Sequence, residues 1–279
     1  MFKSNKNSHL SKNLISGFNQ QETFSLNQFN VLLNKRLAEV NGSSETTRTI
    51  SFYQWVAGLM DASGFFSISK TKNLSCEITV GLHQFQCLYK LKSVFYGTIS
   101  KRQSSNSYRW RLHKKTHVLK FLQCINGFIY IQTEQFKFVL SLYDISFKQV
   151  TLTFTNAWFS GFFEAKGSVN INNISANFQI TISILHKDKK ILDFISNIWL
   201  GSIIYDNLLE CFLWKATSNF HLISLFEYFT LFPLKSTKNA DISSAKRFFR
   251  YKLLNYHQDP LKTDKLTHFV DLFQRRKKI

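Results

Sequence analysis

Two segments of the chain place an acid near the end of an apolar stretch. They are WVAGLMDASGFF at 55–66 and WFSGFFEAKGSV at 158–169. In each one an acid, Asp61 or Glu164, stands three residues before a glycine. Carboxylate oxygens are preferred ligands of Mg²⁺. A carboxylate near the C-terminal end of a helix is unfavourable, however, unless it is paired.

Small residues in the middle of each segment predict that two helices pack closely against each other. The small pairs are Ala57-Gly58 and Ser160-Gly161. Because they lie 103 residues apart, as do Gly64 and Gly167, we expect the helices to meet at a two-fold axis between repeats. Gly64 and Gly167 are expected as helix C-caps, where a left-handed backbone favours glycine.

The same spacing continues through the chain and predicts a duplicated architecture. Leu82-His83 precedes Leu185-His186 by 103 residues, and the pairs Gly97/Gly201 and Trp110/Trp214 are 104 residues apart. Each half is expected to form a helix, two strands, a helix, two strands and a helix, with its second strand at 74–85 in the first half. That order is typical of an α+β fold in which helices cover one face of an antiparallel sheet.

Four segments follow from these patterns. A polar N-terminal extension, with one helix expected at 24–37, occupies 1–46. The two repeats occupy 47–147 and 148–256, and a basic C-terminal tail occupies 257–279.

The paired segments resemble the two motifs of the single-chain LAGLIDADG homing endonucleases and their splicing-maturase relatives. VAGLMDASG at 56–64 and FSGFFEAKG at 159–167 stand where that family has its name motif. PLKSTKNAD at 233–241 is similar to the family's PL-x-x-x-K-x-x-D, so Lys238 matches a lysine near its active site, and Gln135 takes that place in the first half. The resemblance covers roughly 47–256 and implies two αββαββα repeats that form a saddle of antiparallel sheets over duplex nucleic acid.

This chain departs from the family at the two metal-binding positions. In the family the residue before the last motif glycine is the metal-binding acid, and here those residues are Ser63 and Lys166. A hydroxyl is a poor ligand for Mg²⁺ and an ammonium repels it, although Lys166 can pair with a phosphate. Asp61 and Glu164 lie two residues earlier, roughly 200° around the helix. We therefore expect no metal, no cofactor and no catalysis; the alternative is a Mg²⁺-dependent DNA endonuclease that uses these displaced acids.

The charge of the chain predicts a polyanionic partner. The formal net charge is +19, from 36 Lys and Arg against 17 Asp and Glu. Such an excess indicates nucleic acid or an anionic membrane surface. The predicted hairpin SYRWRLHKKT alternates cations with apolar residues and contains no acid, whereas an ordinary solvated face would mix both. The candidate nucleic-acid-binding residues are Lys70, Lys72, Lys101, Arg102, Arg109, Arg111, His113, Lys114, Lys115, Lys166, Arg275, Arg276, Lys277 and Lys278.

Structured RNA is the expected ligand, because A-form RNA is recognised mainly through shape and phosphates. An intron bound by a maturase and ribosomal RNA in an organellar ribosome both remain open, as does DNA, and splicing or ribosomal proteins are the expected partners. With 29 Phe and 2 Pro, the composition suggests an organellar gene and a mitochondrial matrix protein. We expect reduced cysteines, no membrane insertion and no need for a homodimer, since one chain holds both repeats.

Overall fold

The structure is a computed structural model that describes residues 45–69, 73–103, 105–174 and 177–278. Lys70, Lys72 and the helix expected at 24–37 lie outside the described residues, as does the side chain of Lys278.

The first repeat builds one antiparallel sheet with the strand order β1-β2-β4-β3. Its elements are α3 (Glu45–Ser63), β1 (Gly64–Ile68), β2 (Leu74–Gly81), the short η1 (Leu82–Gln84), α4 (Gln86–Phe95), β3 (Thr98–Arg102), β4 (Ser107–Leu112), α5 (Lys115–Ile125) and α6 (Thr133–Ser141). The strand expected at 74–85 ends early, at Gly81. Gly81 pairs with Ser107, the first residue of β4, so no partner strand continues beyond it.

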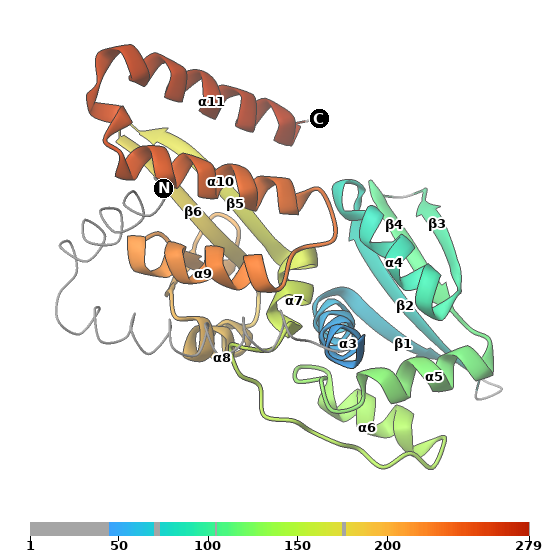
Figure 1. Cartoon of the computed structure of the whole chain (residues 1–279). Helices are drawn as coiled ribbons and strands as arrows, with labels where there is room; N and C mark the ends of the chain where they lie inside the picture. The colour runs from blue at the N-terminus through green and yellow to red at the C-terminus, as the bar shows by residue number, and fades with distance from the viewer. Residues whose placement is uncertain (1–44, 70–72, 104, 175–176, 279) are drawn as a thin grey trace, which may run out of the picture.

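The second repeat builds an equivalent sheet with the order β5-β6-β8-β7. Its elements are α7 (Trp158–Lys166), β5 (Gly167–Ile174), β6 (Asn177–His186), α8 (Lys189–Trp199), β7 (Ser202–Asp206), β8 (Cys211–Ala216), α9 (Asn219–Leu231) and α10 (Lys238–Leu253). The two sheets lie on either side of the pair α3 and α7, with the remaining helices packed around them (Figure 1).

Helices α3 and α7 approach each other closely enough to exclude a side chain at each motif glycine. A Cβ added to Gly58 would lie 1.8 Å from the carbonyl oxygen of Trp158, and one added to Gly161 would lie 1.9 Å from that of Trp55. Ala57 and Ser160, the other small residues of the pairs, are fully buried. The pseudo-two-fold axis between the repeats passes through this reciprocal contact.

The glycines that end the two motifs are required for space and not for a left-handed backbone. Gly167 is the C-cap of α7, as expected, but its backbone is extended, with φ −76° and ψ 154°, so only the left-handed conformation was wrong. The φ of Gly64 is not positive either. A Cβ would lie 2.1 Å from the Met60 sulfur at Gly64 and 2.2 Å from the Phe163 ring at Gly167. Each glycine therefore lets a strand begin directly against the last turn of its helix.

The repeated glycine and tryptophan together form a helix cap in each half. Gly97 and Gly201 have φ values of +84° and +99°, in the left-handed region that favours glycine. The indole of Trp110 donates to the Tyr96 carbonyl at 2.7 Å, and that of Trp214 donates to the Leu200 carbonyl at 2.5 Å. The tryptophan thus caps the end of the helix that precedes the glycine.

The C-terminal segment is a helix and not a solvated tail. After η2 (Tyr256–Gln258), α11 (Pro260–Lys278) runs beside α10 and the β5–β6 hairpin (Figure 1). Leu266, Val270 and Phe273 are buried on its inner face at helical spacing. Residues 257–278 therefore belong to the packed second half.

Candidate nucleic-acid interface

The facing ends of α3 and α7 carry a hydroxyl and an ammonium. Ser63 is half-buried, and its hydroxyl donates to the Leu59 carbonyl at 3.3 Å. Lys166 is exposed. Mg²⁺ takes oxygen ligands, usually including one or two carboxylates, so this pair does not fit the ion. An exposed ammonium at this position fits a phosphate oxygen instead.

Asp61 anchors the segment that leads into α6. Its carboxylate accepts hydrogen bonds from the backbone N–H groups of Tyr130 at 2.8 Å, Ile131 at 3.2 Å and Gln132 at 3.0 Å. It also accepts from the indole N–H of Trp158 at 2.9 Å. Burial raises the pKa of Asp61 to about 6, while these four donors act to lower it. The carboxylate thus has its oxygens occupied by donors from the fold.

Glu164 has the same role in the second half. It is fully buried and accepts from the Lys235 backbone N–H at 2.6 Å and from the hydroxyl of Ser236. Burial raises its pKa, and the Ser236 hydroxyl and the Lys235 N–H oppose that shift. Each motif acid therefore ties its motif helix to the segment before the last helix of its repeat, α6 in the first half and α10 in the second.

Lys238 closes the C-terminal end of α7. Its ammonium donates to the carbonyl oxygens of Phe163 at 3.3 Å, Glu164 at 2.8 Å and Gly167 at 2.6 Å. These acceptors are among the carbonyls that the end of a helix leaves without intrahelical donors. Burial lowers the pKa of Lys238 to about 8, against the attraction of Glu164.

In the first half the equivalent carbonyls are bound by Gln132. Its amide donates to the carbonyl oxygens of Met60 at 2.9 Å, Asp61 at 3.4 Å and Gly64 at 3.3 Å. Gln135, the expected counterpart of Lys238, donates to the Phe66 carbonyl at 3.2 Å, so that expectation was wrong. The constant offset of 103 fails here because α6 begins two residues earlier relative to the motif acid than α10 does.

The outer face of the first sheet contains cations and an acid between them. Arg109 and Arg111 both point away from buried Trp110. Their guanidinium groups contact the carboxylate of Glu77 at 3.1 Å and 3.0 Å. The hairpin itself holds no acid, but β2 pairs with β4 and places Glu77 opposite Arg111. The hairpin is therefore free of acids, but the face that it shares with β2 is not.

The remaining cations of this half are distributed over two faces. Arg102 pairs with Ser107 and shares the face of Arg109. Lys101 pairs with Tyr108, so strand alternation places it on the face of Trp110, contrary to expectation. The ammonium of Lys115 lies 6.0 Å from the centre of the Tyr143 ring. His113 and Lys114, which precede α5, are exposed.

An exposed aromatic ring on the same outer face was not anticipated. Phe65 of β1 pairs with Glu77 and is 56% exposed. Its exposure could have been predicted from strand alternation, because Phe65 directly precedes buried Phe66. Aromatic rings on such surfaces can stack with unpaired bases.

The outer face of the second sheet is mostly uncharged. Val169, Ile171, Ile180 and Ile182 are buried, so their strand neighbours point to the other face. These neighbours are Ser168, Asn170, Asn172, Gln179, Thr181 and Ser183. Lys215 pairs with Ser183 there and was not anticipated as a candidate. The two outer faces thus differ in charge although their folds correspond.

The C-terminal basic run is partly engaged within the fold. Arg276 contacts Asp241 at 2.7 Å, and Lys277 donates to the Val169 carbonyl and to the Asn170 side chain. Arg275 is exposed. Of the three side chains described, Arg275 is therefore the one most available to a ligand.

Two pseudo-symmetric α+β repeats, joined through a glycine-packed helix pair, define the class of this protein as a two-sheet saddle. The chain belongs to the LAGLIDADG endonuclease family, whose model matches residues 56–141 and 159–249.

Related proteins carry both maturase and endonuclease names. The chain is 32% identical over 269 residues to the intron-encoded RNA maturase bI4 of Saccharomyces cerevisiae, which covers 90% of this chain and 42% of that protein. It is 28% identical over 206 residues to the intron-encoded DNA endonuclease ai2a of Dictyostelium discoideum, covering 70% of this chain and 65% of that one. The chain thus spans less than half of the maturase.

A solved structure supports the same fold. The LAGLIDADG homing endonuclease I-LtrWI, bound to its target DNA, superposes with a TM-score of 0.64 at 16% identity. The match covers 80% of this chain and 97% of that one.

Proposed function

We propose that this protein binds structured RNA on its saddle without cutting it, as a maturase of an intron. The observation that carries the proposal is the pair Ser63 and Lys166 at the facing helix ends. A cation there attracts a phosphate and repels the divalent ion that phosphodiester hydrolysis needs. The two nearby acids are buried in hydrogen bonds to the fold.

The similarity to a maturase over most of the chain supports RNA as the ligand. Arg102, Arg109 and Arg111 would contact phosphates, and Phe65 would stack on an unpaired base. Intron-encoded relatives and the Phe-rich composition support a mitochondrial, organelle-encoded protein with splicing proteins as its partners.

A Mg²⁺-dependent DNA endonuclease is the second candidate. The relatives with endonuclease names and the DNA-bound neighbour favour it. On this alternative, Asp61 and Glu164 would have to leave their present hydrogen bonds to reach a metal.

Binding and cleavage assays with the full chain separate the two. The ligands are transcripts of the organellar introns and ribosomal RNA of its source, and duplex DNA of the same sequences. We expect tight binding to one intron transcript, no cleavage with added Mg²⁺, and a five- to tenfold loss of affinity for Lys166→Met. Lys120→Met, at an exposed position on α5, is the matched control and should leave affinity unchanged.

Tight binding to ribosomal RNA alone would reject the intron assignment. Site-specific DNA cleavage that requires Mg²⁺ would reject the proposal as a whole.

A further inference from the structure

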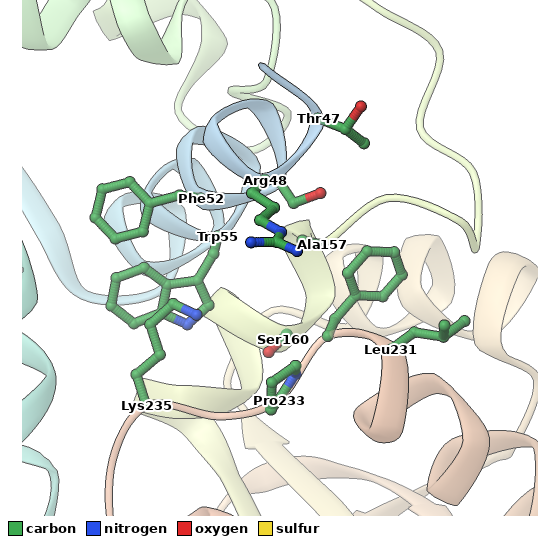
Figure 2. Close-up of a pocket in the computed structure, with 11 residues that line it drawn as sticks. Thr47, Arg48, Phe52, Trp55, Ala157, Ser160, Leu231, Pro233 and Lys235 are labelled. Atoms are coloured by element: carbon green, nitrogen blue, oxygen red, sulfur yellow. The ribbon is translucent and has the colours of Figure 1, made fainter. Parts of the chain in front are cut away.

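A cavity lies against the first half of α3, away from the helix ends described above. It has a volume of about 160 Å³ and is lined by α3, α7 and the segment between α9 and α10. Trp55 lines it and precedes Ser63 by two helical turns, roughly 12 Å along the axis. Figure 2 shows Arg48 reaching from α3 across the space between Trp55 and Ala157. The cavity is therefore separate from the proposed RNA surface.

Two of the residues that line this cavity each carry a buried polar atom that has no hydrogen-bond partner among the described residues. These atoms are the indole nitrogen of Trp55 and the hydroxyl oxygen of Ser160. Their residues are 1% and 0% exposed. A buried donor without a partner costs about 1–3 kcal/mol, so folded proteins seldom retain two at one place without use.

The repeat symmetry explains how the indole of Trp55 comes to be left over. Trp158, its counterpart, donates across the axis to Asp61 at 2.9 Å. The corresponding acceptor for Trp55 would be Glu164. Glu164 instead accepts from the Lys235 backbone and from Ser236, so the N–H of Trp55 has no acceptor among the described residues.

Cations complete the lining. The ammonium of Lys235 lies 5.1 Å from the centre of the Trp55 ring, and Arg48 is exposed at the rim. No Asp or Glu is among the described residues that line the cavity. An indole N–H, a hydroxyl, an ammonium and a guanidinium together offer donors to an anionic acceptor.

The walls and the size define the rest of the ligand. Phe52, Leu231 and Phe232 contribute apolar surface. An apolar cavity of about 150 Å³ is large enough for one benzene ring, whereas drug-sized ligands need about 300 Å³ or more. The ligand is therefore one ring or a group of similar size.

We propose that this cavity binds a carboxylate carried on a ring-sized apolar group. The carboxylate is placed by Trp55, Ser160, Lys235 and Arg48, and the apolar group lies against Phe52 and Leu231. Two sources have this chemistry: a free aromatic acid, or the C-terminal residue of a partner protein.

The test is an indole ¹⁵N NMR titration of the full chain, with the Trp55 signal assigned through Trp55→Phe. The probe is phenylacetate, and phenylacetamide is the neutral control of the same shape. We expect phenylacetate to shift the Trp55 signal and to bind at least tenfold more tightly than the amide. Lys235→Met and Ser160→Ala should each weaken binding at least fivefold, and Lys120→Met should not.

Ser160→Ala also keeps the test valid if a variant is unstable, because removing an unpaired buried hydroxyl should leave the fold intact. A short peptide ending in phenylalanine, with a free or an amidated terminus, distinguishes the sources. Tighter binding of the free terminus than of phenylacetate assigns a chain terminus, and the reverse assigns a free acid. An unmoved Trp55 signal, or equal effects of acid and amide, would overturn the proposal and leave the cavity to water.

Discussion

Lys238 and Gln132 bind the equivalent carbonyl groups at the ends of α7 and α3. The two residues reach acceptors whose numbers differ by 103, although the residues themselves differ by 106. One carries a charge and the other does not. The task at this position is therefore to cap a helix end, and in the first repeat a neutral amide is sufficient for it.

Replacing Lys238 with glutamine should change the pH dependence of stability. Burial lowers the pKa of Lys238 from 10.5 to about 8. Between these values the unfolded chain binds the proton and the folded chain does not, so the free energy of unfolding rises with pH. The rise is at most about 3 kcal/mol, and less to the extent that the side chain meets water.

Urea unfolding from pH 7.5 to 10 measures this effect. We expect the Lys238→Gln protein to fold, as Gln132 does the same work, and to lack this part of the rise. Lys120→Gln, which removes an exposed lysine, is the control and should keep it. Equal slopes for wild type and Lys238→Gln would show that Lys238 does not titrate in this range.

Gly58 should tolerate a side chain far less well than Gly81. In Gly58→Ala the new methyl group would overlap the Trp158 carbonyl, a backbone atom that cannot rotate away. We expect a loss of more than about 3 kcal/mol in thermal or urea unfolding, since overpacking moves whole helices. Gly81→Ala is the control, because its new methyl would meet only the end of the Gln84 side chain. A loss below 1 kcal/mol for Gly58→Ala, on the scale used for such substitutions, would contradict the close contact.

At the scale of elements, strand alternation was predictable and strand pairing was not. The order of residues in β4 predicted that Arg109 and Arg111 point to the sheet face opposite that of Trp110, and the structure confirms this. Glu77 lies 32 residues before Arg109, and only the β2–β4 register brings the two together. Lys101 was assigned to the wrong face because a run of cations carries no information about where its strand begins its alternation.

The helix α11 was not predicted from the sequence. The basic run at its end did not decide between a solvated tail and a segment that binds phosphates. Its stability comes from burial of Leu266, Val270 and Phe273 against the second repeat, a tertiary contact.

Two side chains of α11 also cap the free edge of β5. Gln274 donates to the Ile171 carbonyl at 3.2 Å, and Lys277 donates to that of Val169. We expect the double variant Gln274→Ala/Lys277→Met to lose about 1–3 kcal/mol of unfolding free energy and to show faster amide exchange in β5. Arg275→Ala, on the same turn, is the control and should stay within about 0.5 kcal/mol. Unchanged exchange in the double variant would mean that α11 does not protect this edge.

In the whole molecule, the two repeats share one fold but differ in the residues on their outer sheet faces. The helix pair, the tryptophan caps and the buried acids recur in both repeats. The outer sheet faces differ: the first carries arginines and Phe65, and the second carries amides and hydroxyls. A ligand on the saddle would therefore meet one charged face and one mostly uncharged face.

The fold could be inferred from sequence because its signals recur at constant spacing. The site was harder to predict from the sequence, since the positions of Gln132 and Glu77 depend on loop length and strand register. The unpaired indole at the Trp55 cavity results from a break in the repeat symmetry, and no single residue of the sequence predicts that break.

The proposal that this protein binds intron RNA without cutting it is tested by purifying the protein under native conditions and sequencing the nucleic acid that accompanies it. We expect enrichment of a single intron RNA, intact in the presence of Mg²⁺. Enrichment of a single DNA site that is cut when Mg²⁺ is added would contradict it, and would mean that Asp61 and Glu164 leave their hydrogen bonds to bind metal.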